Sequence, residues 1–168
     1  MSKKVAIILS GCGVFDGAEI NETVLTALSL DQQGAQVEYF APDITQHHVL
    51  NHQTGEEMPE QRNVLVESGR ITRGKSRDIR ELKAADFDAV ILPGGFGVAK
   101  NLSDFASAGA DCTVQADTLQ AILQFKEAKK PVGLICIAPA LSAKIFGEGV
   151  RCTIGTDADT AAAMTQMG

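Results

Sequence analysis

The sequence has few aromatic residues: its 168 residues include no Trp, one Tyr and seven Phe. Proteins that bind single-stranded nucleic acid stack bases on aromatic rings and hold phosphates with clustered Lys and Arg. Here Asp and Glu outnumber Lys and Arg by 21 to 15, and the formal net charge is −6. We therefore expect no nucleic-acid partner.

Long apolar runs are also missing. The longest, Val132–Ala143, is interrupted by Gly133, Pro139 and Ser142 and is too short to span a bilayer. At the N-terminus a basic start is followed by Val5–Leu9, a short strand-like run rather than the apolar core of a signal peptide. These features predict a cytoplasmic protein with no membrane partner.

Cysteine and histidine are scarce and are not grouped as metal ligands. No two cysteines have the spacing Cys-x-x-Cys, and no histidine stands beside one in the sequence, so we expect no metal and no cofactor. In a reducing compartment the cysteines are expected to be free thiols, although each could equally be a small buried apolar residue. They are Cys12, Cys112, Cys136 and Cys152.

What the sequence does contain is an alternation of apolar runs with amphipathic segments. The apolar runs predict strands buried on both faces, at Val5–Leu9, Val37–Ala41, Ala89–Leu92 and Val132–Ile135. Helices are predicted at Glu19–Gln33, Glu60–Ile71, Thr118–Lys129, Pro139–Phe146 and Asp157–Gly168. Two further segments are expected to be a basic connector, Thr72–Arg80, and a short extended run, Arg151–Ile154.

This alternation predicts an α/β fold in which a mainly parallel sheet is covered by helices on both faces. The length suits one domain, residues 1–168, with no linker or internal repeat. Because the last predicted helix is followed by no strand, we expect the domain to be truncated at its C-terminal end.

In such a sheet the functional residues usually lie in the loops that follow the carboxyl ends of the strands. Cys136 lies in one of them, where a buried strand stops and a helix starts, and small residues follow it. This arrangement is typical of a nucleophile elbow. A helix N-terminus there is expected to lower the pKa of the thiol, and the next N–H can stabilise an oxyanion. The pattern alone is equally compatible with a structural cysteine. The three candidate loops are Ser10–Gly17, Pro93–Asn101 and Cys136–Pro139.

The other two loops carry groups that suit a reactive thiol. Gly94 and Gly95 follow the third predicted strand, and glycine-rich backbone presents free N–H groups to an anion. Glu19 and Glu22 share one face of the first predicted helix, and one of them could exchange a proton with a thiol or a substrate. Each feature has a plain alternative, a turn for the glycines and solvated first-turn residues for the glutamates.

Several longer motifs occur in order along nearly the whole chain. They include Ile8–Gly17 (ILSGCGVFDG), Pro93–Ala106 (PGGFGVAKNLSDFA), Cys136–Ala140 (CIAPA) and Thr153–Thr160 (TIGTDADT). With these motifs the sequence resembles the ElbB-like family of the PfpI superfamily. The resemblance implies a three-layer sandwich with the flavodoxin-like fold of class I glutamine amidotransferase-like proteins. It also implies a homodimer.

The resemblance implies a role for each matching residue. Cys136 matches the nucleophilic cysteine, and Glu22 matches the glutamate that hydrogen-bonds to it, with Glu19 as the weaker candidate. Gly94 and Gly95, with the N–H of Ile137, match the oxyanion hole. The family is credited with converting glyoxal to glycolate without a cofactor, and it has been linked by name to isoprenoid biosynthesis.

One departure from the superfamily pattern limits the possible chemistry. Many members carry a histidine after the strand that follows the elbow, but here that region has none. A Cys-His-acid triad for amide hydrolysis is therefore not supported. Asp157 could occupy that corner, His52 could approach from its own loop, and Cys12 could lie near Cys136.

We therefore predict a glyoxalase III-like lyase that uses a cysteine to convert glyoxal or a related small aldehyde or dicarbonyl into the hydroxy acid. One alternative is a thiol-based sensor of oxidative stress or a binding protein, in which Cys136 is oxidised. Another is a glutamine-amidotransferase-like subunit linked to isoprenoid biosynthesis, which the missing histidine makes the weakest of the three.

Overall fold

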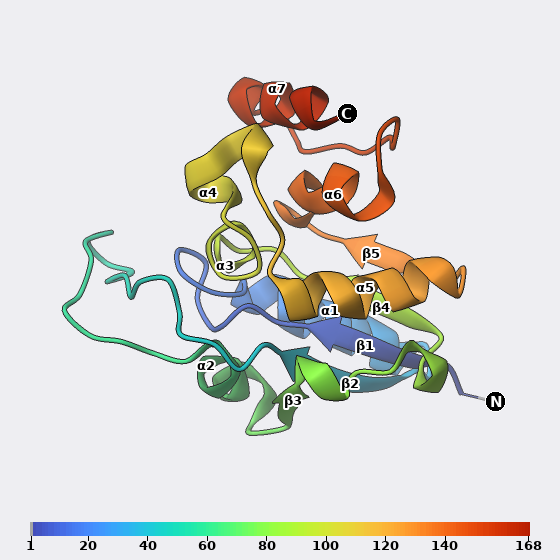
Figure 1. The fold of residues 1–168 in the computed structure, drawn as a ribbon. Helices are drawn as coiled ribbons and strands as arrows, with labels where there is room; N and C mark the ends of the chain where they lie inside the picture. The colour runs from blue at the N-terminus through green and yellow to red at the C-terminus, as the bar shows by residue number, and fades with distance from the viewer. Residues whose placement is uncertain (1) are drawn as a thin grey trace.

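A five-stranded parallel sheet runs through the centre of the protein, here described for residues 2–168 of a computed structural model (Figure 1). The strand order is β3-β2-β1-β4-β5, so the chain starts in the middle of the sheet and builds outward to both edges. In register, Ile7 lies between Tyr39 of β2 and Ile91 of β4. The strands are β1 Lys4–Ile8, β2 Gln36–Ala41, β3 Ser76–Asp78, β4 Ala89–Leu92 and β5 Val132–Leu134.

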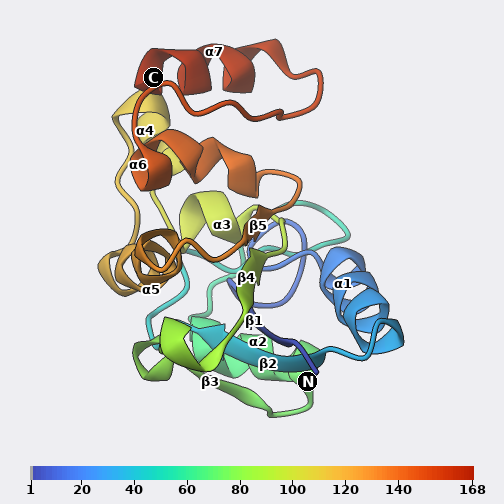
Figure 2. The same ribbon diagram turned by 90° about the vertical axis from the view of Figure 1, so that its right-hand side faces the viewer.

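Helices cover the two faces of the sheet, which gives three layers when the molecule is viewed from the side (Figure 2). On one face lie α1, Ile20–Gln32, and α2, Val64–Thr72. The opposite face is covered by α5, Ala116–Glu127. The remaining helices are α3 Gly97–Lys100, α4 Phe105–Ala108, α6 Ser142–Phe146 and α7 Ala158–Met167. The predicted α/β sandwich with a parallel sheet is therefore confirmed.

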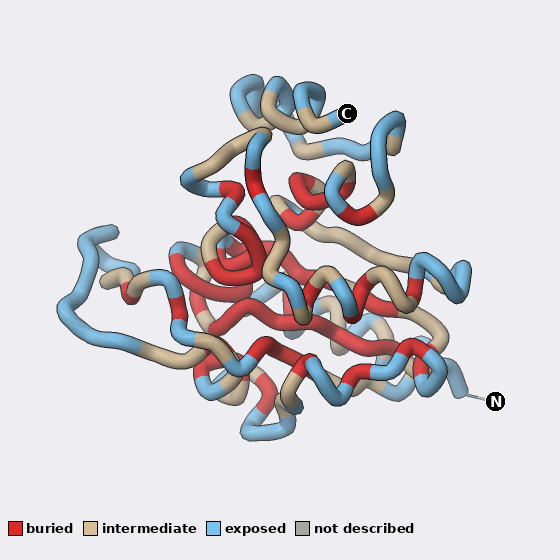
Figure 3. Tube along the Cα trace, viewed as in Figure 1, coloured by how far each residue is buried: buried red, intermediate tan, exposed pale blue. Residues whose placement is uncertain are grey.

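The side chains of the strands pack into two apolar cores, one on each side of the sheet. Ile8 and Leu92 pack with Phe125 of α5, whereas Ile7 and Leu9 pack against α1 and α2. The buried segments of the chain accordingly follow the central strands (Figure 3). Residues buried on both faces explain why the strands have continuous apolar runs instead of an alternating pattern.

One face of α1 is apolar but remains exposed. Ile20, Val24, Leu25 and Leu28 are 43–59% exposed, although three of them recur at a spacing of four residues. Beside this helix lies a groove of about 450 Å³, whose far wall includes Ile91 and Ile135 of the β4–β5 side of the sheet. Adjacent exposed apolar residues of this kind are typical of interaction surfaces.

Three local features differ from the sequence predictions. The segment expected to be a basic connector contains β3, a short edge strand whose sequence Ser-Arg-Asp carries no apolar signal. Arg151–Ile154 forms no strand, and only an isolated bridge joins Ile154 to Thr156. The second helix also begins at Val64 instead of Glu60, because the side chain of Asn63 caps it by accepting the Val66 N–H at 3.0 Å.

The predicted absence of a membrane span can be compared with the helices directly. Among residues 2–168, no helix combines the length and the apolar character needed to cross a bilayer.

Candidate active site

The three loops singled out in the sequence meet at the carboxyl ends of β1, β4 and β5, which are neighbours in the sheet. Backbone hydrogen bonds join the first two loops directly. The Glu19 N–H donates to the Gly94 carbonyl at 2.9 Å, and the Phe96 N–H donates to the Val14 carbonyl at 2.7 Å. The glycine loop after β4 is therefore held against the start of α1.

This close approach requires glycine. Gly95 has φ = +94°, and a Cβ there would lie 2.3 Å from the carbonyl oxygen of Gly17. A Cβ on Gly17 would in turn lie 2.3 Å from the backbone nitrogen of Cys12. Both distances are far below van der Waals contact, so the glycine-rich loops reflect the need to bring two backbones together.

Cys136 lies on a sharp turn with a left-handed backbone conformation. Its φ is 58°, which is uncommon for any residue other than glycine. The strand β5 ends two residues earlier, and a single 3₁₀ turn, Ala138–Leu141, begins two residues later. Strained backbone of this kind persists where the surrounding structure enforces it, and it is frequent at functional sites. The turn leaves the Cys136 side chain exposed in the single chain.

Four groups surround the Cys136 thiol. The Gly94 backbone is closest, since a Cβ on Gly94 would lie 2.4 Å from the Cys136 Cβ and 3.0 Å from its Sγ. The N–H groups of Gly95 and Ile137 favour the anionic form of the sulfur and lower its pKa, whereas the Glu22 carboxyl disfavours that form through its charge and through hydrogen bonding. The structure thus brings together all five residues that the sequence placed at the reactive centre.

The pKa of the Cys136 thiol is nevertheless raised. Partial burial is the largest cause, the negative charge and hydrogen bond of Glu22 add to it, and the N–H groups of Gly95 and Ile137 oppose it. The prediction that a helix N-terminus lowers this pKa is therefore wrong. The physical reason is that partial burial of the thiol, together with the facing Glu22 carboxylate, outweighs the N–H groups of Gly95 and Ile137.

The two glutamates of the first helix have different positions. Glu22 reaches the glycine loop, where its Oε2 accepts the Gly94 N–H at 2.7 Å. Glu19 is the N-cap of α1, and its own Oε2 accepts the Glu22 N–H at 2.6 Å. Glu22 therefore faces the thiol, and Glu19 caps the N-terminus of the helix that carries Glu22.

The remaining candidate residues have other contacts. His52 Nε2 accepts the Phe15 N–H at 3.2 Å and lies 3.8 Å from an oxygen of Asp16. Asp157 caps α7 by accepting the Thr160 N–H at 2.7 Å. None of these contacts involves Cys136.

The groups around the Cys12 thiol differ from those around Cys136. The pKa of its thiol is raised, first by burial and then by the carboxylate of Glu67. Arg70 lowers it, because its guanidinium favours the thiolate. All four cysteines are free thiols, so the structure contains no bond between Cys12 and Cys136.

Sequence reasoning missed a residue that ties these loops together. The buried Asn101 side chain donates hydrogen bonds of 2.8 Å to the carbonyls of Ser10 and Asp16. Its Oδ1 accepts the His47 N–H at 2.9 Å. The only signal in the sequence is its place at the end of the glycine loop, since nothing local shows which partners its amide will find.

Metal ligands are also relevant to the chemistry of the site. In the part of the chain that the structure describes, residues 2–168, no three His, Cys, Asp or Glu side chains are grouped so that they could hold a metal ion. The groups at Cys136 are a thiol, a carboxylate and backbone N–H donors.

A parallel α/β sandwich with a cysteine on a strained strand-to-helix turn defines the flavodoxin-like, amidotransferase-like class of proteins. Comparison with known families gives the particular group. The chain belongs to the DJ-1/PfpI family, whose profile matches residues 3–164.

Individual relatives agree with this assignment. The chain is 52% identical over 153 residues to the ES1 protein homolog, mitochondrial, of Rattus norvegicus, covering 90% of this chain. It is 51% identical to the Homo sapiens protein named glutamine amidotransferase-like class 1 domain-containing protein 3, mitochondrial, over 90% of the chain. The chain spans 57% of the length of each of these two relatives.

A solved structure shows the same fold. The crystal structure of an isoprenoid biosynthesis protein with amidotransferase-like domain from Ehrlichia chaffeensis is similar, with a TM-score of 0.90 and 38% identity. The similarity covers 99% of this chain and 76% of that one.

The prediction of a cytoplasmic location is contradicted by these relatives. The rat and human proteins, and an ES1 protein of Danio rerio that is 36% identical, are each named mitochondrial. The prediction rested on the N-terminal residues of this sequence, which do not determine the compartment in which its relatives are found.

Proposed function

We propose that the protein is a cofactor-independent enzyme that converts glyoxal, or a related small dicarbonyl, into the hydroxy acid. The observation that carries the proposal is the environment of Cys136. A strained turn holds the thiol against the carboxyl group of Glu22 and against two backbone N–H groups. A nucleophile, a proton carrier and donors for an oxyanion are the three components that this reaction requires.

The first step follows from the raised pKa of Cys136. At neutral pH the sulfur is held mainly as a thiol, so Glu22 takes its proton while the sulfur attacks the aldehyde carbon. A carbon–sulfur bond forms, the carbonyl π bond breaks, and the oxygen becomes an oxyanion. In this proposal the N–H groups of Gly95 and Ile137, which already favour negative charge on the sulfur, stabilise that oxyanion.

The second step is an internal redox exchange that needs no external oxidant. Glu22 first returns the thiol proton to the oxyanion, which gives a hemithioacetal and restores the carboxylate. The Glu22 carboxylate then removes the proton from the carbon bonded to sulfur and returns it to the neighbouring carbonyl carbon, while the hydroxyl proton of the hemithioacetal moves to the neighbouring oxygen. The first carbon is thereby oxidised to a thioester, and the second is reduced to an alcohol. Water then cleaves the thioester, which releases the hydroxy acid and restores the Cys136 thiol.

Within the DJ-1/PfpI family, we propose that the chain belongs to the ElbB-like group. Support comes from the motifs around the elbow and from the similarity to the Ehrlichia chaffeensis protein, which is named for isoprenoid biosynthesis. His52 contacts Phe15 and Asp16, and within residues 2–168 no histidine is hydrogen-bonded to Cys136, which disfavours an amidotransferase subunit.

The direct test measures glycolate formed from glyoxal by the wild-type protein and by the Cys136→Ala and Cys136→Ser variants. The wild type should form glycolate without added glutathione, and both variants should lose the activity by at least about a hundredfold. Cys152→Ala is the matched control, because this second exposed thiol donates a hydrogen bond to the Pro139 carbonyl at 3.9 Å and is not one of the groups that act on the Cys136 thiol. Equal rates in the wild type and Cys136→Ala would refute the proposal.

For the partner, we propose a second copy of the chain, which covers the exposed face of α1. Ile20, Val24 and Leu28 form an apolar stripe on this helix, and the groove beside it contains Glu22 at one end. A self-complementary pairing would bury both stripes at once, as is common in symmetric dimers. It would also remove water from the vicinity of Glu22.

A further inference from the structure

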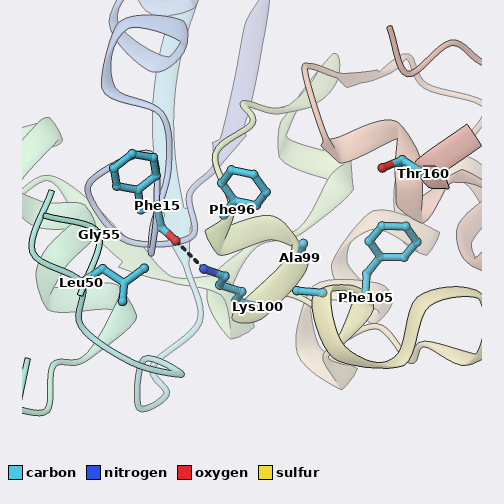
Figure 4. Close-up of a pocket in the computed structure, with 9 residues that line it drawn as sticks. Phe15, Leu50, Gly55, Phe96, Ala99, Lys100, Phe105 and Thr160 are labelled. Atoms are coloured by element: carbon cyan, nitrogen blue, oxygen red, sulfur yellow. Dashed lines mark hydrogen bonds between the residues drawn. The ribbon is translucent and has the colours of Figure 1, made fainter. Parts of the chain in front are cut away.

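A second cavity, separate from the Cys136 thiol, has the composition of a ligand site. It has a volume of about 420 Å³ and lies between the first glycine-rich loop, the loop after β2, and α3 and α4 (Figure 4). The rings of Phe15, Phe96 and Phe105 line it, together with Leu50. This volume and this apolar lining are within the range of pockets that hold small organic molecules.

Lys100 is the charged residue that lines the cavity. Its Nζ donates to the Phe15 carbonyl at 2.8 Å and lies 5.4 Å from the centre of the Phe96 ring, which fixes the direction of the ammonium (Figure 4). Among residues 2–168, no carboxylate lies within 4.0 Å of this ammonium. Burial lowers the pKa of Lys100, and only Asp16 opposes that effect.

The nearest candidate to neutralise Lys100 is already engaged elsewhere. Asp16 is buried, and its Oδ2 accepts the Leu50 N–H at 2.7 Å, which joins the first loop to the loop after β2. The backbone of Asp16 is fixed as well, because its carbonyl accepts a hydrogen bond from Asn101. The walls of the cavity are therefore held in place before any ligand binds, which lowers the cost of binding.

We propose that this cavity binds a small aromatic carboxylate, whose ring packs among Phe15, Phe96 and Phe105 and whose carboxylate pairs with Lys100. The aromatic walls favour a flat apolar group over a polar one. The ammonium favours an anion and repels a cation, and in an apolar setting its hydrogen bonds to a carboxylate are strong. The site lies beyond the chemistry proposed for Cys136, which is not among its lining residues.

The test uses three probes that separate the ring from the charge. Isothermal titration calorimetry of the full chain should show saturable one-to-one binding of phenylacetate. Phenylacetamide, which keeps the ring and loses the charge, and acetate, which keeps the charge and loses the ring, should each bind at least about tenfold more weakly. Failure of phenylacetate to bind, or equal binding of phenylacetamide, would overturn the proposal.

Two variants locate the binding in the structure. Lys100→Met keeps the apolar stem and removes the charge. It should therefore weaken the binding of phenylacetate by about tenfold and leave the binding of phenylacetamide unchanged. Ala106→Trp fills the cavity from its exposed rim and should weaken both ring compounds. Near-unchanged phenylacetate binding in both folded variants would refute the assignment.

A third variant separates this cavity from the proposed active site. Cys136→Ala should bind phenylacetate as the wild type does, because the thiol is outside the cavity. Loss of binding in that variant would place the compound at Cys136 and overturn the proposal, whether or not the protein converts glyoxal.

Discussion

The amide of Gly94 donates a hydrogen bond of 2.7 Å to Oε2 of Glu22, so the carboxyl group that faces the Cys136 thiol is oriented by the glycine loop itself. The same loop supplies the N–H of Gly95, which favours the thiolate form of Cys136. Proton carrier and anion donor are thus positioned by one short stretch of backbone. Their relative geometry depends on that stretch remaining free of side chains.

Gly94→Ala should disrupt this arrangement. The new Cβ would lie 2.4 Å from the Cys136 Cβ and 2.7 Å from Glu22 Oε2. Relief of these clashes would require the strained turn at Cys136 to shift or the hydrogen-bonded Glu22 carboxylate to leave its position, and both changes cost free energy. We expect loss of glycolate formation together with a cost of about 1–3 kcal/mol in unfolding free energy. The control is Gly69→Ala in α2, where the nearest atom to the new Cβ lies 3.8 Å away. An active Gly94→Ala enzyme would show that this geometry is not required.

Glu22→Gln should lower the pKa of Cys136. The negative charge and hydrogen bond of Glu22 raise this pKa, so removing the charge increases the fraction of thiolate at neutral pH. We expect iodoacetamide to alkylate Cys136 several-fold faster at pH 7, with the pH profile shifted to lower values, since one pKa unit corresponds to a tenfold change. Glycolate formation should nevertheless be lost, because the amide cannot carry a proton.

Glu19→Gln is the matched control for that experiment. Glu19 caps α1 through the Glu22 N–H, and an amide oxygen can accept the same hydrogen bond. The pH profile of Cys136 alkylation should therefore stay where it is in the wild type. A shift as large as that of Glu22→Gln would mean that helix position, not the facing charge, controls the thiol.

Local patterns in the sequence were sufficient for the central strands and the elbow. Val5–Leu9 and Ala89–Leu92 are apolar throughout, and burial on both faces allows few other structures for such runs. The edge strand β3 could not be found in this way. Its residues Ser76–Asp78 are polar because an edge strand is only partly covered, so pairing with β2 determines its conformation.

In the candidate site, too, local sequence predicts some features, whereas others depend on contacts between distant segments. The cysteine and glycine motifs lie in single loops, and each has a backbone requirement that a short sequence can express. The pKa of Cys136 could not be inferred, because its direction depends on how closely Glu22 approaches from another element. The three partners of Asn101 are likewise more than 50 residues away along the chain.

Asn101→Ala should destabilise the glycine loop, the first loop and the loop after β2 together. The substitution leaves the carbonyls of Ser10 and Asp16 and the N–H of His47 without their partner in a buried setting. We expect a loss of about 2–4 kcal/mol in unfolding free energy and a lower thermal midpoint. Asn21→Ala is the control, since this asparagine is exposed and its side chain reaches only Glu19. A near-neutral Asn101→Ala would indicate that water replaces the amide.

Mild peroxide treatment tests the alternative role of Cys136 as an oxidised thiol. The exposed Cys136 should be oxidised before the buried Cys112, whose thiol pKa is raised by burial. Because the pKa of Cys136 is also raised, its oxidation should accelerate as the pH rises and be slow at neutral pH. Peptide mass spectrometry over a pH series measures both trends. Rapid oxidation of Cys136 at neutral pH would favour a sensor over an enzyme.

Val24→Asp should separate a dimer that pairs through α1. Val24 is 48% exposed in the single chain, so a charge there costs little in the monomer, whereas in a dimer it would be buried without a partner. Sedimentation velocity should show a dimer for the wild type and a monomer for the variant, with similar thermal midpoints at low concentration. Val66→Asp on α2 is the control, because Val66 is 67% exposed and lies outside the stripe. A wild-type chain that sediments as a monomer at all concentrations would exclude this pairing, and the apolar stripe would then be covered by something other than a second copy.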